Sequence, residues 1–126
     1  MIFKDKKIIV VIPAYNEEEI INTVITNLMQ KLINLNFKII ILNDGSIDNT
    51  LKKLEIFKSD DRIIIINKEN EGHGKTLVKG YDLALKMDAD YILQIDSDDQ
   101  IPLDEVQKLI VYIKNYSLVC GYRYNR

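Results

Sequence analysis

The chain of 126 residues has one cysteine, one histidine, two prolines and no tryptophan. A single cysteine, Cys120, excludes an internal disulfide framework and fits a reducing cytoplasm. Its neighbours Val119 and Gly121 are apolar, so nothing around it favours a reactive thiolate. An excess of basic charge is also missing, because 17 Lys and Arg residues oppose 19 Asp and Glu residues for a net charge of -2. That balance argues against nucleic acid as a partner.

Apolar runs long enough to cross a bilayer are missing from the sequence as well. Lys4, Lys6 and Lys7 precede the apolar run 8–12 as in a signal peptide, but this run is too short and three glutamates follow it at 17–19. We therefore expect a cytoplasmic protein, with any membrane contact peripheral and at the inner face of the membrane. Hydrophobic residues make up 47% and charged residues 29%, a balance typical of one globular domain of this length.

What the sequence does contain is an alternation of apolar runs with helical patterns. The runs expected to be strands are 8–12, closed by Pro13, then 37–42, 62–66, 91–95 and 117–120. The first helix is expected to be capped by Asn16 with Glu19, and the fourth to begin at Pro102. The inward residues of the four helices are expected to be Ile21, Val24, Ile25, Leu28 and Leu32; Leu51 and Leu54; Leu77, Tyr81, Ala84 and Leu85; and Val106, Leu109, Ile110 and Ile113. This order predicts an α/β fold with a mostly parallel sheet and helices on both faces.

The polar peculiarities of the sequence fall in the loops that follow the strands. In a parallel α/β sheet these loops lie along one edge, where such folds bind ligands. The loops hold residues 15–17, 44–46, 70–74 and 96–100. Asp96 and Asp98 follow a strand and are two residues apart, so on an extended backbone they point to the same side and are able to share one Mg²⁺ or Mn²⁺ ion. The alternative for this cluster alone is a solvated acidic turn.

A phosphate-binding loop is the first nucleotide-binding pattern to consider, because Gly74, Lys75 and Thr76 stand between a predicted strand and a predicted helix. That motif requires a glycine five residues before Gly74, where this chain has Glu69. A carboxylate there would repel the phosphates. A dinucleotide-binding turn is not supported either, because residues 13–16 after the first strand contain no glycine.

Five motifs taken together resemble glycosyltransferase family 2, the GT-A-fold enzymes that use nucleotide-sugar donors. In chain order they are IPAYNE at 12–17, NDGSIDNT at 43–50, NEGHG at 70–74 with Gly80, DSD at 96–98, and GYRY at 121–124. The sequence DSDDQ at 96–100 followed by GYR most resembles the branch of dolichyl-phosphate mannose synthases and bacterial polyprenyl-phosphate glycosyltransferases. The resemblance runs from about Lys7 to the end of the chain. It implies that 1–126 is the nucleotide-sugar-binding part of a catalytic domain, with a sheet incomplete at the C-terminus.

The resemblance implies a role for each matching residue. Pro13, Tyr15 and Glu17 would line the nucleoside pocket, and Asp44 beside Gly45 would contact the base, although a turn also explains an aspartate there. Gly72 and Gly74 would allow close approach of the donor at the start of a helix. The DxD motif and its continuation would bind Mn²⁺ or Mg²⁺ through Asp96, Asp98 and Gln100. The family often has an acidic residue where this chain has Asn43, and this difference leaves the identity of the nucleotide base undetermined.

The resemblance also implies what the site would act on. Asp98 and Arg123 would be the catalytic residues, with Arg123 near the phosphate of the acceptor. The expected partners are a UDP- or GDP-linked sugar donor and an acceptor that is either a lipid phosphate or a saccharide. The expected activity is an inverting, metal-assisted glycosyl transfer, and the alternative is a nucleotide-sugar-binding module that does not transfer. Exposed sheet edges and apolar surface would favour self-association if the acceptor half is lacking.

Overall fold

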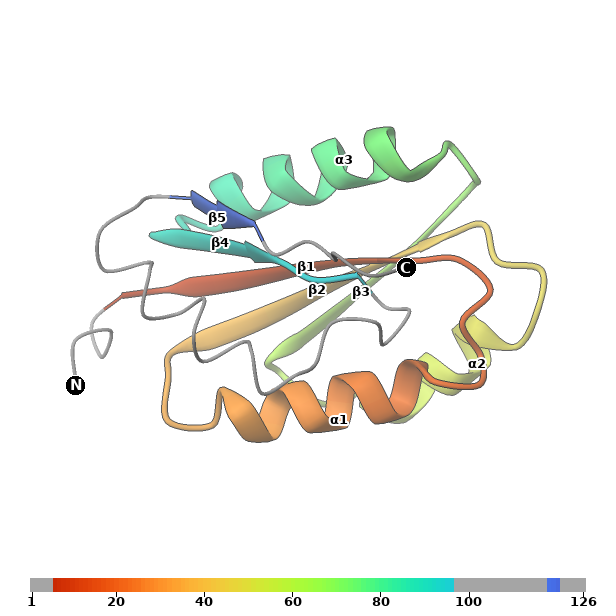
Figure 1. Ribbon diagram of the computed structural model, residues 1–126, viewed down its shortest axis with the longest axis horizontal. Helices are drawn as coiled ribbons and strands as arrows, with labels where there is room; N and C mark the ends of the chain where they lie inside the picture. Colours follow the sequence, from red (N-terminus) through yellow and green to blue (C-terminus); the bar gives the residue numbers. More distant parts are fainter. Residues whose placement is uncertain (1–5, 97–117, 121–126) are drawn as a thin grey trace, which may run out of the picture.

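The computed structural model of the chain describes residues 6–96 and 118–120. Within these residues five strands and three α-helices follow one another, with a short 3₁₀ helix, η1, after the second α-helix (Figure 1). Their bounds are β1 Ile8–Ala14, α1 Ile21–Lys31, β2 Phe37–Asp44, α2 Thr50–Leu54, η1 Glu55–Phe57, β3 Ile63–Lys68, α3 His73–Lys86, β4 Tyr91–Gln94 and β5 Leu118–Cys120. The fourth predicted helix lies outside the described residues.

The strands form one sheet in the order β3-β2-β1-β4-β5, and every described pair is parallel. Helices α1 and α2 lie on one face of this sheet and α3 lies on the other, so three layers result (Figure 1). The predicted α/β fold with a parallel sheet covered on both faces is therefore confirmed. The strand order reverses direction between β1 and β4, and such a switch point opens a crevice at the carboxyl ends of the strands.

The central strand β1 is buried along its whole length. Successive side chains of a strand point to opposite faces. Accordingly, Ile8, Val10 and Ile12 pack with the α1 side of the core, whereas Ile9 and Val11 pack with the α3 side. The β-branched run therefore supplies both cores at once, as a strand buried on both faces requires.

Pro13 does not end the first strand, contrary to the prediction, because β1 continues to Ala14 and Pro13 pairs with Leu42 of β2. The carbonyl of Val11 accepts from the Ile95 amide on the β4 side. A residue two positions further along the strand presents its backbone to the same side, and the register of β1 with β4 ends at Val11 and Gln94. The missing N–H of Pro13 therefore falls beyond the paired part of β4, where a proline is tolerated.

The first helix begins later than the sequence indicates. Its first residue is Ile21, the residue before it is Ile20, and no side chain caps it. The predicted capping by Asn16 is therefore wrong: Asn16 has a φ of 53° and its side chain is used elsewhere. The predicted inward stripe is confirmed, because all five of its residues are buried: Ile21, Val24, Ile25, Leu28 and Leu32.

The stripes of the other two described helices differ in part from the prediction. Leu54 is buried as expected, whereas Leu51 is half-buried. On α3, Ala84 is buried and Leu77 and Tyr81 pack on the second core, but Leu85 is 62% exposed. Leu83 is partly buried against the sheet instead.

Gly80 sets how closely α3 approaches the sheet. A Cβ atom at this position would lie 2.4 Å from Cγ1 of Val11 and 3.0 Å from Cδ1 of Leu42. The absence of a side chain therefore lets the helix pack directly on β1 and β2, which fixes the start of α3 relative to the carboxyl edge.

We predict that Gly80→Ala lowers the free energy of unfolding by about 1–3 kcal/mol through overpacking. This loss would occur although alanine favours a helix over glycine by about 1 kcal/mol. Gly74→Ala is the matched control on the same helix, because no described atom lies within 4 Å of a Cβ there. Urea denaturation followed by circular dichroism measures both, and equal stability of the two variants would contradict the packing argument.

Candidate functional site

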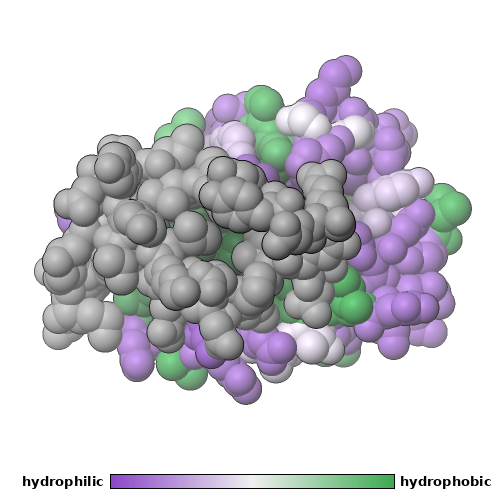
Figure 2. All heavy atoms as spheres, in the orientation of Figure 1, coloured by the Kyte–Doolittle hydropathy of each residue, from purple (hydrophilic) through white to green (hydrophobic). Residues whose placement is uncertain are grey.

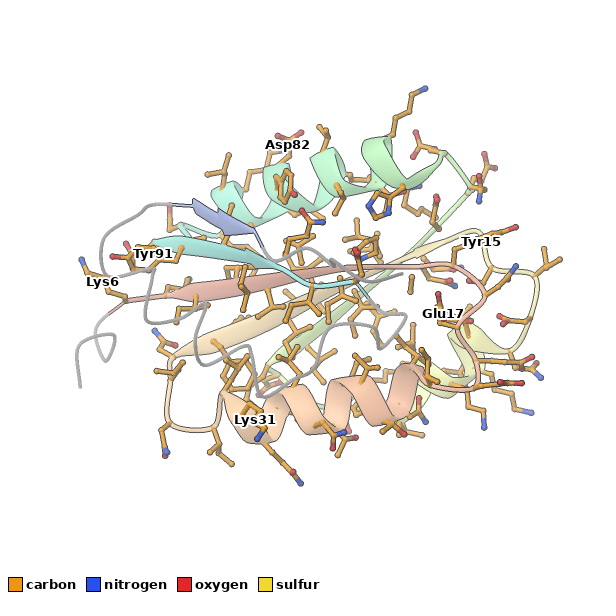
Figure 3. All side chains as sticks on the ribbon, in the orientation of Figure 1. Lys6, Tyr15, Glu17, Lys31, Asp82 and Tyr91 are labelled. Atoms are coloured by element: carbon orange, nitrogen blue, oxygen red, sulfur yellow. The ribbon has the colours of Figure 1, made fainter. Side chains whose placement is uncertain are left out.

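The carboxyl edge of the sheet carries the loops that the sequence singled out. Tyr15 and Glu17 lie in the loop between β1 and α1 at this edge, whereas Lys6 and Tyr91 lie at the opposite edge (Figure 3). The surface over the loops that follow β1 and β2 is mainly hydrophilic (Figure 2). Tyr15 is 46% exposed, which leaves this aromatic residue accessible to a ligand.

The loops after β1 and β2 are joined by hydrogen bonds between side chains and backbone. The Asn16 amide donates to Oγ of Ser46 at 2.9 Å, and Oδ1 of Asn16 accepts from the Ile47 amide at 2.9 Å. The positive φ of Asn16 is thus held by partners 30 and 31 residues away in the sequence. Reciprocal bonds of this kind fix the two loops relative to each other without any regular secondary structure.

A second set of hydrogen bonds joins the same two loops. Oγ1 of the buried Thr50 accepts from the Glu17 amide at 2.9 Å and donates to Oδ1 of Asp48 at 2.6 Å. Asp48 also accepts from the amides of Thr50 at 2.9 Å and Glu18 at 3.3 Å. A hollow of about 290 Å³ lies beside these contacts, lined by Asn16, Glu17, Glu18, Glu19, Ile20 and Asp48.

Asp44, the last residue of β2, joins the loop after β3 to this edge. Its Oδ1 accepts from Nζ of Lys68 at 2.7 Å and from the Glu71 amide at 2.8 Å, and its Oδ2 accepts from the Gly72 amide at 3.1 Å. The backbone oxygen of Asp44 accepts from Nδ2 of Asn70 at 2.9 Å. Asp44 itself is only 5% exposed.

The charges at this position stabilise one another. Burial alone raises the pKa of Asp44, but hydrogen bonds from Lys68, the Glu71 amide and Thr76, with the charge of Lys68, lower it overall. Burial alone lowers the pKa of Lys68, and its bonds to Asp44 and Glu71 raise it overall. The hydrogen bond and charge of Lys68 also lower the pKa of Glu71. All three groups are therefore held in their charged forms.

The two glycines expected to admit a ligand have different surroundings. Gly72 precedes α3 with a φ of 93°, a conformation that favours glycine, and its amide donates to Asp44 rather than to a free surface. Gly74 lies exposed in the first turn of α3. Gly45 also has a positive φ, and a Cβ on it would lie 2.5 Å from the Asn70 nitrogen. Gly45 therefore allows the loop after β2 to approach the loop after β3 closely.

Sequence reasoning missed several residues that organise this edge. Lys68 lies beyond the predicted strand 62–66 and carries no predicted role, yet it ends β3, its side chain is 4% exposed, and it forms ion pairs with Asp44 and with Glu71. Asn43 is buried; its Nδ2 donates to Oδ1 of Asn67 at 3.0 Å and its Oδ1 accepts from Ser46 at 2.5 Å. Sequence position offers one signal for these residues, since each stands at or just before the carboxyl end of an apolar strand.

Asp96 stands at the switch point between β1 and β4. The bond from the Ile95 amide to the Val11 carbonyl, at 3.1 Å, continues the pairing of these strands up to the residue before it. Oδ1 of Asp96 is buried and has no hydrogen-bond partner among the described residues. A buried carboxylate oxygen without a donor is costly, and a cation would compensate it. The residue therefore fits the expected metal ligand.

The structure brings together Tyr15, Glu17, Gly45, Gly72 and Asp44 near one edge, with Asp96 at its switch point. Pro13 is buried within the sheet, at the start of that edge. Of the three expected metal ligands only Asp96 is described; Asp98 and Gln100 lie outside the described residues, as does Arg123. No cluster of three or more His, Cys, Asp or Glu side chains suited to a metal occurs within residues 6–96.

A parallel α/β sheet with a switch point beside its central strand defines a domain of the doubly wound type, a class that binds ligands at the carboxyl ends of its strands. The chain belongs to glycosyltransferase family 2, because residues 9–126 match the family described as Glycosyl transferase family 2. Within residues 6–96, none of the helices has both the length and the apolar character needed to cross a membrane.

Curated relatives agree with this family. The chain is 36% identical to a UDP-N-acetylglucosamine–dolichyl-phosphate N-acetylglucosaminyltransferase of Methanococcus voltae, with 90% of this chain and 49% of the relative covered. It is 33% identical to an undecaprenyl-phosphate 4-deoxy-4-formamido-L-arabinose transferase of Proteus mirabilis, with 98% and 39% covered. A dolichol-phosphate mannosyltransferase of Pyrococcus furiosus is 32% identical, with 94% and 33% covered. The chain thus spans about half the length of these relatives or less.

Solved structures share the fold. TarS of S. aureus, crystallised with UDP-GlcNAc, aligns with a TM-score of 0.63 and 26% identity over 86% of this chain and 31% of that one. Glucosyl-3-phosphoglycerate synthase of Mycobacterium tuberculosis, crystallised with Mn²⁺, UDP and glucosyl-3-phosphoglycerate, aligns with a TM-score of 0.66 and 23% identity over 87% and 40%. The expected GT-A arrangement is confirmed by these alignments.

We predict that Thr50→Val lowers the free energy of unfolding by about 1–3 kcal/mol, because the Glu17 amide and the Asp48 carboxylate each lose a hydrogen bond from an isosteric change. Thr23→Val, on the exposed side of α1, makes the same chemical change and is expected to stay within about 0.5 kcal/mol of the wild type. Urea denaturation compares the two. Equal losses of unfolding free energy in the two variants would mean that the loop contact does not stabilise the fold.

We also predict that Asp44 makes the free energy of unfolding depend on pH. Its pKa is lowered below the ordinary 3.8 in the folded chain, so its stabilisation is fully present above that value and is lost as pH falls through the folded-state pKa. The difference in unfolding free energy between the wild type and Asp44→Asn should therefore narrow between about pH 5 and about pH 2. Denaturant titrations at several pH values measure it, and a constant difference would contradict the ion pair.

Proposed function

We propose that the chain is the donor-binding part of an inverting glycosyltransferase that takes a UDP- or GDP-linked sugar. The observation that carries this proposal is Asp96, whose buried Oδ1 lacks a partner among the described residues at the switch point of the sheet. Family membership supports a donor of this class, and so do the relatives named as a UDP-N-acetylglucosamine–dolichyl-phosphate transferase and an undecaprenyl-phosphate arabinose transferase, which also support a polyprenyl-phosphate acceptor.

The donor would enter at the carboxyl edge. Tyr15 offers an exposed ring against which a base can stack, and the loop with Glu17 is held in place by Thr50 before any ligand arrives. Loops fixed in advance reduce the entropy that binding must overcome. Pro13 would support this loop from within the sheet, since it is buried between the core and the edge.

The metal ion, Mn²⁺ or Mg²⁺, would be bound by Asp96, Asp98 and Gln100. Both ions prefer oxygen ligands, and these three side chains supply oxygen atoms. When bound, such an ion would neutralise the charge that develops on the departing nucleoside diphosphate. Transfer would break the bond between the anomeric carbon and the diphosphate and form a bond from the acceptor oxygen on the opposite face of the sugar. A lipid phosphate is already ionised, so it needs no strong general base, and Arg123 would bind it.

The second candidate is a nucleotide-sugar-binding module without transferase activity. The chain covers 33% to 49% of the curated relatives named above, so the activity of those whole proteins is tested separately from donor binding. A fold that binds a donor does not by itself secure transfer.

We predict that Asp96→Asn weakens binding of the preferred nucleotide, UDP or GDP, by about ten-fold or more in the presence of Mn²⁺ and abolishes the effect of Mn²⁺ on that binding. Isothermal titration calorimetry with and without Mn²⁺ measures both. Asp82→Asn is the control, because Asp82 is exposed on the outer side of α3 (Figure 3). Unchanged affinity and unchanged metal dependence in Asp96→Asn would rule out the metal role.

A transfer assay then distinguishes the two candidates. Wild-type chain, donor sugar nucleotide, Mn²⁺ and a short polyprenyl phosphate are combined, and the lipid-linked sugar is measured. Product formation supports the transferase, and donor binding without product supports the module. Absence of nucleotide binding in the wild-type chain contradicts both.

A further inference from the structure

The hydroxyl of Tyr81 connects α3 to the end of β4. It donates a hydrogen bond to Oε1 of Gln94, which is the last residue of β4. Both residues are half-buried. The sequence predicted Tyr81 only as an inward residue of a helix and Gln94 only as part of a strand. Because a phenylalanine would fill the same space in the core, the hydroxyl adds a polar contact that packing alone does not require.

Gly80 brings this tyrosine within reach of β4. The missing side chain of Gly80 lets α3 lie directly against Val11 of β1. Tyr81 is the next residue, and it packs against the same core as Val11 and Ile92. Gln94 is the register partner of Val11 on β4. The helix is therefore seated on β1, and from this seat Tyr81 reaches one strand further.

The end of β4 is held from both faces of the sheet just before Asp96. The register of β4 with β1 ends at Gln94, and the bond from the Ile95 amide to the Val11 carbonyl extends the pairing by one residue. The Ile95 side chain is buried in the core on the α1 side. Gln94 bonds on the α3 side, as the alternation along a strand requires. One of these two residues is thus anchored by burial and the other by the hydrogen bond of Tyr81.

The carboxylate of Asp96 depends on this strand end for its position. Asp96 follows Gln94 by two residues, and its buried Oδ1 has no hydrogen-bond partner among the described residues. No donor in the described part of the chain orients this oxygen, so the backbone that carries it must do so. Groups that orient a metal ligand strongly affect how well it binds the metal. A contact that fixes the strand end therefore bears on any ion bound by Asp96.

We propose that Tyr81 is a positioning residue for Asp96: its hydrogen bond to Gln94 holds the end of β4 against α3, and so holds the carboxylate of Asp96 where the metal ion of the donor complex is to be bound. The proposal rests on the proposed function for the role of Asp96. The contact itself belongs to the chain without ligand, so it can be tested separately.

The first test measures amide hydrogen exchange by NMR in the chain without nucleotide or metal. Tyr81→Phe removes only the hydroxyl and should speed exchange of the Ile95 amide by about three- to ten-fold, because the strand end loses one of its anchors. Tyr91→Phe makes the same chemical change at the other end of β4 (Figure 3) and should leave that rate within about two-fold. An unchanged rate for Ile95 in Tyr81→Phe would overturn the proposal, whatever the chain binds.

The second test measures how Mn²⁺ changes the affinity for the preferred nucleotide, UDP or GDP, by isothermal titration calorimetry. Tyr81→Phe should reduce the gain in affinity that Mn²⁺ produces by about ten-fold, the lower end for groups that orient metal ligands. Its affinity without Mn²⁺ should match that of the wild type, because Tyr81 acts on the metal ligand and not on the nucleotide. Gln94→Met and the double variant should show the same loss, because all three break one contact. Tyr91→Phe should bind as the wild type does.

The outcomes separate the roles. A loss in Gln94→Met with a normal Mn²⁺ effect in Tyr81→Phe would mean that Gln94 contacts the ligand itself and would overturn the proposal. A lower urea midpoint in Tyr81→Phe with an unchanged Mn²⁺ effect would mean that the hydroxyl serves the fold alone and would overturn it as well. An equal fall in affinity with and without Mn²⁺ would place Tyr81 in the nucleotide pocket, which also contradicts the proposal.

Two further results are distinguishable from these. Should Gln94→Met fail to fold, Tyr81→Phe still decides the question, because it removes a single oxygen atom. Failure of the wild type to bind any nucleotide would contradict the proposed function. The exchange rate of the Ile95 amide would then still decide whether Tyr81 holds the strand end.

Discussion

The arrangement of this chain depends on the burial of β1 between two parallel neighbours. All seven of its residues are buried, and its register with β2 and β4 fixes where each of the following loops begins. Because every described pair is parallel, the loops after β1, β2 and β3 must lie at one edge, where β4 also ends. The reversal of strand order beside β1 then brings Asp96 to the same end as Tyr15 and Glu17. The location of the candidate site is therefore a consequence of core formation.

The edge is held together by polar contacts that connect distant parts of the sequence. Asn16 bonds to Ser46 and Ile47, Glu17 bonds to Thr50, and Asp44 bonds to Lys68 and to the backbone after it. Each loop is thus oriented by its neighbour in addition to its own turn contacts, such as the bonds from Thr50 to Asp48 and from Ser46 to Asn43. Removal of one partner would leave a buried donor or acceptor unpaired, which costs more than the bond contributes when formed. Such an edge is preorganised, as expected for a surface that must receive a charged ligand with little rearrangement.

The strands and the face of α1 were predictable from the sequence because their signal is local. A run of β-branched residues such as 8–12 has few structural alternatives, and the stripe from Ile21 to Leu28 has the helical period. The end of β1 and the buried side of α3 were not predictable in the same way. Pro13 remains in its strand because β4 is not paired beside it, and Leu85 is exposed because the crossing of α3, set by Gly80, turns Leu83 toward the sheet. These outcomes depend on neighbours that the local pattern does not contain.

The contacts within the site were still harder to predict. Asn16 followed by Glu19 has the spacing of a cap, but the tertiary partner of Asn16 is Ile47, and the local preference is overridden. The predicted strand 62–66 stops short of Lys68, because nothing in the sequence says that the strand partner of Lys68 is an aspartate. The motifs identified the edge and the family, whereas the use of each residue there depended on the register of β2 with β3.

The charge of this edge bears on how it could hold a diphosphate. Its carboxylates include Glu17, Asp48 and Asp96, while the buried cation Lys68 is neutralised by Asp44 and Glu71. Lys75 and Lys79 lie near enough to Glu71 to lower its pKa, but both are exposed and their charge is screened by salt. An anionic donor therefore requires a concentrated positive charge from a source other than these lysines. Under the proposed function, a divalent ion bound through Asp96 would supply this charge and would also satisfy the buried oxygen of that carboxylate that has no partner among the described residues.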